Sequence, residues 1–110
     1  MGGSRTKRLL IKQATGRLLL EGEKLEGGFD LEEGDKGWKI TLRGVEPALA
    51  GEIGRLLDEL NVFYFEEGPD GQLSKWWLYD KERPDLQYAQ EARTLQLSVD
   101  SRQAYTNQGV

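Results

Sequence analysis

Residues 68–71, Gly-Pro-Asp-Gly, separate two aromatic runs, and this segment constrains the fold more than any other. The runs are residues 62–65, Val-Phe-Tyr-Phe, and residues 75–79, Lys-Trp-Trp-Leu-Tyr. Proline presets φ at the first turn position, aspartate suits the second, and Gly71 accepts the left-handed conformation that closes the loop. The pattern therefore predicts a β-hairpin that is rich in aromatic side chains.

Side chains alternate across a strand, so the adjacent Trp76 and Trp77 must point to opposite faces of this hairpin. One indole can face a core, whereas the other must be covered by more protein, by a partner or by a ligand. The pattern leaves open which of the two faces solvent. With a three-residue loop ending at Gly71, one face carries Phe63, Phe65, Lys75, Trp77 and Tyr79, and the other carries Val62, Tyr64, Trp76 and Leu78.

Two more hairpins are indicated upstream. Short apolar runs at residues 8–12 and 17–21 flank a turn at residues 14–16. Residues 29–32 and 38–43 alternate between apolar and charged side chains on either side of a second glycine-containing turn. Alternation of this kind is typical of strands with one face in a core and one face in water.

One helix is predicted from Pro47 to Leu60. Proline suits the first helical position, and Asn61 is an acceptable stop. An apolar stripe at helical spacing covers one side, with polar residues on the other. Its members are Leu49, Ile53, Leu56, Leu57 and Leu60.

The last third of the chain has a weaker pattern. Residues 86–93 are interpreted as a short helix and residues 95–99 as a strand. We expect a flexible leader at residues 1–4, a single domain over residues 5–99 and a disordered polar tail over residues 100–110. The predicted fold class is α+β: an antiparallel sheet of about five to seven strands built from hairpins, with one amphipathic helix packed on one face.

The composition argues against catalysis. The chain has no cysteine and no histidine, which removes disulfides, thiolate chemistry, zinc-finger ligands and the usual general base. Adjacent acids at residues 32–33 and 66–67 would point to opposite faces of a strand, so neither pair converges. The acidic loop at residues 30–35 lacks EF-hand spacing. We expect no enzyme activity, cofactor or metal, and a soluble cytoplasmic protein without membrane contact, since no apolar stretch approaches about 18 residues.

Charge is distributed unevenly along the chain, whose net charge is −4. Five basic residues precede residue 18 with no acid among them, and seven acids follow between residues 21 and 35, relieved only by Lys24. The basic and acidic strands can pair across the sheet. Alternatively, the basic strand is presented to an acidic partner or to phosphates.

These observations predict a protein-interaction module, a small accessory or regulatory subunit that docks a larger protein through the aromatic hairpin face. A domain that binds single-stranded nucleic acid with the same aromatic patch and the basic N-terminal strand is the alternative. Homodimer formation is compatible with both. The expected partner-binding residues are Phe63, Phe65, Lys75, Trp77 and Tyr79 on the hairpin and Arg5, Lys7 and Arg8 on the first strand.

Overall fold

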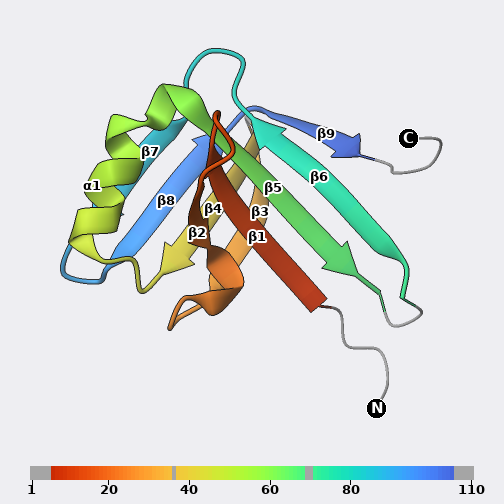
Figure 1. Ribbon diagram of the computed structural model, residues 1–110, viewed down its shortest axis with the longest axis horizontal. Helices are drawn as coiled ribbons and strands as arrows, with labels where there is room; N and C mark the ends of the chain where they lie inside the picture. The colour runs from red at the N-terminus through yellow and green to blue at the C-terminus, as the bar shows by residue number, and fades with distance from the viewer. Residues whose placement is uncertain (1–5, 36, 69–70, 106–110) are drawn as a thin grey trace.

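The computed structural model describes residues 6–35, 37–68 and 71–105. Within these ranges the chain forms strands, one α-helix and two short 3-10 helices (Figure 1). In chain order the elements are β1 (Thr6–Gln13), β2 (Leu18–Glu21), η1 (Gly22–Lys24), β3 (Phe29–Gly34), β4 (Gly37–Arg43), α1 (Pro47–Arg55), η2 (Leu57–Glu59), β5 (Leu60–Glu67), β6 (Leu73–Tyr79), β7 (Asp85–Ala89), β8 (Thr94–Val99) and β9 (Ser101–Tyr105). The predicted leader at residues 1–4 lies outside the described residues.

The strands form two antiparallel sheets. The five-stranded sheet has the order β2-β1-β5-β6-β9, and the four-stranded sheet has the order β3-β4-β8-β7. Figure 1 shows β1, β5 and β6 in front of β4 and β8. The mixed α+β class is confirmed, but the prediction of a single sheet of about five to seven strands is wrong, since the described residues form two sheets of five and four strands. Successive hairpins alternate between the sheets, and each sheet buries its apolar face against the other.

The core lies between the two sheets. The helix adds Ala50 and Ile53 to it, and η2 adds Leu57. α1 joins β4 in one sheet to β5 in the other and lies along one side of the sandwich (Figure 1). A helix of 9 residues covers too little surface to bury a whole sheet face, which is why the second sheet takes that role. Beside these three, the buried hydrophobic residues are Leu9, Ile11, Leu20, Ile40, Leu42, Val45, Val62, Tyr64, Leu78, Leu95, Leu97 and Val99.

The predicted helix over residues 47–60 is too long. It ends at Arg55, and the Leu56 N–H bonds the carbonyl oxygens of both Glu52 and Ile53 at 3.1 and 3.2 Å. Such shared bonds mark the tightening of a last turn toward 3-10 geometry. The chain then enters β5 at Leu60, because strand pairing with Gln13 takes precedence over the helical stripe.

Two predictions near the C-terminus are also corrected. Residues 86–93 do not form a helix: Asp85–Ala89 is β7, with Leu86 and Tyr88 packed against the core between more exposed neighbours. Two apolar residues are too few to reveal a period of two. Residues 101–105, predicted as part of a disordered tail, form β9 and pair with β6. Residues 106–110 lie outside the described residues.

No helix among the described residues is both long and apolar enough to span a bilayer.

Candidate functional site

The aromatic hairpin forms as predicted, with Phe63 opposite Trp77, Tyr64 opposite Trp76 and Phe65 opposite Lys75. This register confirms the predicted division of side chains between the two faces. The turn is closed by hydrogen bonds between residues 68 and 71 and between residues 68 and 72, at 3.0 and 2.9 Å. Gly71 has φ +83°, the left-handed value that favours glycine there. Residues 69 and 70 of the turn lie outside the described residues.

One face of the hairpin looks into the sandwich. Val62, Tyr64 and Leu78 are buried on it, and Trp76 packs against the core. The Tyr64 ring meets Phe29 of the other sheet edge to face, with ring centroids 6.2 Å apart. The question that the sequence left open is therefore answered: Trp76 faces the core, and Trp77 lies on the opposite side.

The other face forms an aromatic surface across three neighbouring strands. Leu10 on β1 lies opposite Phe63 on β5, which lies opposite Trp77 on β6. All are partly exposed, and none belongs to the core or to the hydrophobic residues packed against it. We call this surface the outer aromatic face; it consists of Arg8, Leu10, Phe63, Phe65, Lys75, Trp77 and Tyr79.

Exposed leucines extend the outer aromatic face at two corners. Leu18 pairs with Lys12 and is 45% exposed, and Leu73 pairs with Glu67 and is 54% exposed. Sequence reasoning missed both, and also missed Leu10. A signal for Leu10 was present: residues 9–11 are three consecutive apolar residues, which cannot all face one core from a strand.

The outer aromatic face contains a ring stack and a contact between a cation and a ring. Trp77 and Tyr79 stack with centroids 4.4 Å apart and planes 23° apart, and the Lys75 Nζ atom lies 5.4 Å from the centre of the Phe65 ring. Among the described residues, the Trp77 Nε1–H is the buried side-chain polar atom that has no hydrogen-bond partner. An unpaired buried donor costs free energy.

The basic residues of the first strand do not lie on one face of the sheet. Arg8 lies on the outer aromatic face, but strand alternation places Lys7 on the opposite side, facing Glu66 in the register. Arg5 lies outside the described residues. The Arg8 guanidinium reaches Glu23, with Nε and Oε2 3.5 Å apart. The predicted pairing of basic and acidic segments is thus present at this position.

Glu23 is bound by more than Arg8. Its Oε1 accepts a hydrogen bond from the Leu9 backbone N–H at 3.1 Å. Burial raises the pKa of Glu23, but hydrogen bonds from the backbone N–H groups of Glu23 and Leu9, together with Arg8, outweigh this effect and lower the pKa below its usual value. The carboxylate therefore stays ionised and neutralises part of the charge at this edge of the outer aromatic face.

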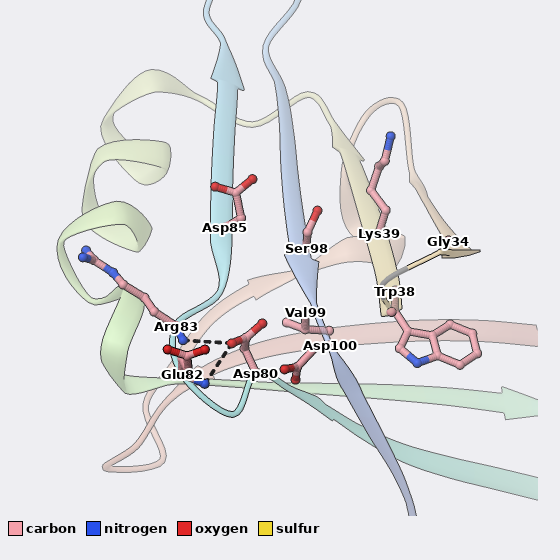
Figure 2. A pocket seen from close by; sticks show the side chains of 11 residues that line it. Gly34, Trp38, Lys39, Asp80, Glu82, Arg83, Asp85, Ser98, Val99 and Asp100 are labelled. Carbon is pink, nitrogen blue, oxygen red and sulfur yellow. Dashed lines mark hydrogen bonds between the residues drawn. The ribbon is translucent and has the colours of Figure 1, made fainter.

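A separate cleft lies against the four-stranded sheet. Its volume is about 540 Å3, and Trp38 forms part of its wall (Figure 2). Asp80 holds the neighbouring turn, since its Oδ1 accepts the backbone N–H groups of Glu82 and Arg83 at 2.9 and 2.8 Å. The charged residues that line it are Lys39, Asp80, Glu82, Arg83, Asp85 and Asp100.

Asp100 stands at the corner where the chain passes from β8 to β9. Its Oδ1 accepts hydrogen bonds from the Ser101 hydroxyl at 2.8 Å and the Lys81 backbone N–H at 3.1 Å. The Ser101 hydrogen bond is the main reason that the pKa of Asp100 lies below its usual value. In the part of the chain that the structure describes, no group of three or more potential ligand side chains could hold a metal ion.

Comparison with protein-family models, with curated proteins and with solved structures finds no match for this chain.

Proposed function

We propose that this protein is a non-enzymatic interaction module that docks a larger protein through the outer aromatic face. The observation that carries the proposal is the row formed by Leu10, Phe63 and Trp77. These side chains are partly exposed on three paired strands and contribute nothing to the core. Contiguous exposed apolar groups with a charged rim are typical of protein interfaces.

The rigidity of the sheet favours tight docking. β1, β5 and β6 are neighbours in the five-stranded sheet, so their side chains are held in fixed rows. An aromatic side chain buries about 150–250 Å2 when covered, and it loses little conformational freedom on binding. Trp77 and Tyr79 are already stacked, which lowers the ordering cost further. We therefore expect these two rings to be the central anchors.

The charged residues around the aromatic row suggest the chemistry of the partner. Arg8, Lys12 and Lys75 lie on the same face as the aromatic row. Glu21 and Glu67 lie on this face too, so a partner surface with an apolar centre and a rim of both charge signs would complement it, and the exposed Lys7 at the end of β1 would attract acids of the partner at long range. We also propose that the protein acts in the cytoplasm, and that self-association through this face competes with docking.

Single-stranded nucleic acid is the second candidate. The Trp77–Tyr79 stack beside Lys75 supports it, because bases stack on such rings while lysine holds the phosphates. The charge pattern supports it less well: Arg8 is paired with Glu23, and Glu21 shares the face through its pairing with Leu10. Phosphates bound at this face would be repelled by these carboxylates.

The test compares purified wild type with Trp77→Ala and with a control, Lys39→Ala, on the four-stranded sheet. A partner captured from the cytoplasmic fraction of the native host is purified and its affinity measured. We expect Trp77→Ala to weaken binding by at least about tenfold and Lys39→Ala to leave it unchanged. Equal affinity of wild type and Trp77→Ala would refute the docking face.

A parallel titration addresses the nucleic-acid alternative. Tryptophan fluorescence is followed while a short single-stranded oligonucleotide is added at low salt and again at high salt. Saturable quenching that high salt reverses would favour nucleic acid over a protein partner, because counterion release makes such binding salt-dependent. We expect no saturable change.

A further inference from the structure

Arg102 lies between two tryptophan rings that come from different sheets. Its Cζ atom is 3.9 Å from the ring centre of Trp76 on β6 and 4.1 Å from the ring centre of Trp38 on β4. Arg102 itself belongs to β9 and lies opposite Leu78 in the register, on the side of the sheet that faces the core. The guanidinium thus closes one end of the sandwich as a cation between two indoles.

The two rings have contacts besides Arg102, although Trp76 also pairs through its backbone with Ala104 on the same strand as Arg102. Trp38 and Trp76 both pack against the hydrophobic core. Trp38 is paired through its backbone with Val99 on β8, and Trp76 with Tyr64 on β5. The indoles therefore form a slot whose walls are positioned by the sandwich, and Arg102 is the group that fills it.

Arg102 has no acidic partner among the described residues, although its side chain is exposed at the mouth of the slot. The contact is thus one of a cation with aromatic faces rather than an ion pair. A guanidinium is flat, weakly hydrated and stacks on aromatic rings, whereas an ammonium is compact and strongly hydrated. The distances of 3.9 and 4.1 Å from Cζ to the ring centres are those of van der Waals contact with each ring.

We infer that the slot between Trp38 and Trp76 is a guanidinium-binding site, which the chain fills with its own Arg102 and which takes an external guanidinium when Arg102 is removed. The ligand class is the side chain of arginine or a similar flat organic cation. In the intact chain the site is masked by β9, so external cations do not enter it.

The surroundings favour a cation. Trp38, but neither Trp76 nor Arg102, also lines the cleft that contains Asp80 and Asp100. Four acidic and two basic side chains of the described residues line that cleft. Such an excess of negative charge raises the local concentration of cations.

Chemical rescue of Arg102→Ala tests the inference. The full chain with this substitution is compared with wild type in thermal unfolding, with millimolar ethylguanidinium chloride, ethylammonium chloride or sodium chloride added. We expect the variant to unfold about 4–8 °C below wild type. Ethylguanidinium should recover part of this difference, whereas ethylammonium and sodium should not.

The site of binding is checked by NMR. Ethylguanidinium should shift the indole N–H signals of Trp38 and Trp76 in Arg102→Ala, leave that of Trp77 in place, and shift none of them in wild type. No rescue, or an equal response in wild type, would overturn the inference.

If Arg102→Ala does not fold, two further variants test whether the slot prefers a planar cation. Arg102→Lys keeps the positive charge but lacks a planar cationic group. Arg102→Met keeps much of the side-chain volume but has neither the charge nor the planar group. We expect the melting temperature to fall in the order wild type, Arg102→Lys, Arg102→Met. A methionine variant as stable as wild type would show that the slot has no preference for a cation.

Discussion

Trp77 stacks on Tyr79, two residues further along the same strand, with ring centroids 4.4 Å apart. The neighbouring Trp76 packs against the core on the opposite face. Strand alternation thus gives two adjacent tryptophans different roles: Trp76 belongs to the sandwich, and Trp77 belongs to the outer aromatic face.

This division predicts unequal effects on stability. Trp76→Ala removes core packing and one wall around Arg102, and we expect it to lower the free energy of unfolding by about 3 kcal/mol. Trp77→Ala removes mainly a surface stack, and we expect a loss of about 1 kcal/mol. Urea unfolding followed by far-UV circular dichroism measures both. Equal losses would contradict the assignment of faces.

Glycine substitutions provide a second prediction. Gly37 has φ +145°, and a Cβ atom there would collide with the backbone of Val99 and Asp100. We expect Gly37→Ala to cost at least about 2 kcal/mol of unfolding free energy. Gly54 lies within α1 with open space around it, so Gly54→Ala should stabilise by about 0.5–1 kcal/mol. Thermal unfolding of the two variants side by side tests the opposite signs.

The corner at Asp100 is expected to respond to pH. Its lowered pKa comes chiefly from the Ser101 hydroxyl. Because the folded state has the lower pKa, the associated stabilisation is present at neutral pH and is lost as pH falls through that pKa, below about pH 4. Ser101→Ala should raise the pKa of Asp100 toward its usual value. Carboxyl-detected NMR titration reads this directly, and an unchanged pKa would refute the role of Ser101.

Glu23 gives the fourth prediction. Glu23→Ala leaves the Leu9 N–H without its side-chain acceptor and Arg8 without its partner, so we expect a loss of about 1 kcal/mol in unfolding free energy at pH 7. The folded pKa of Glu23 is lowered, so this contribution disappears as pH falls through it. Wild type and variant should therefore converge in stability at acidic pH. Glu91→Ala, at an exposed turn, is the matched control.

Local patterns predicted the first three hairpins well because turns and alternation are properties of neighbouring residues. The Gly71 turn and the Trp76/Trp77 division follow from spacing alone. The predictions for residues 86–93 and 100–105 were wrong for a different reason. β7 and β9 have few apolar side chains, and each becomes a strand by pairing with β8 or β6. Such pairing depends on distant residues and leaves little trace in the segment itself.

The residues of the two candidate sites also come together through pairing of strands that are distant in the sequence. Phe63, Phe65, Trp77 and Tyr79 could be grouped from the hairpin alone, whereas Leu10 and Arg8 join them only because β1 pairs with β5. The Arg102 slot could not have been predicted, since its walls come from β4 and β6.

The sequence by itself determined the first three hairpins, the start of α1 and the existence of two aromatic faces, because these depend on contacts within a few residues. Only the tertiary structure decided which face is covered, how the strands divide between two sheets and where Arg102 lies. Those outcomes depend on burying all apolar faces at once, and that requirement involves the whole chain.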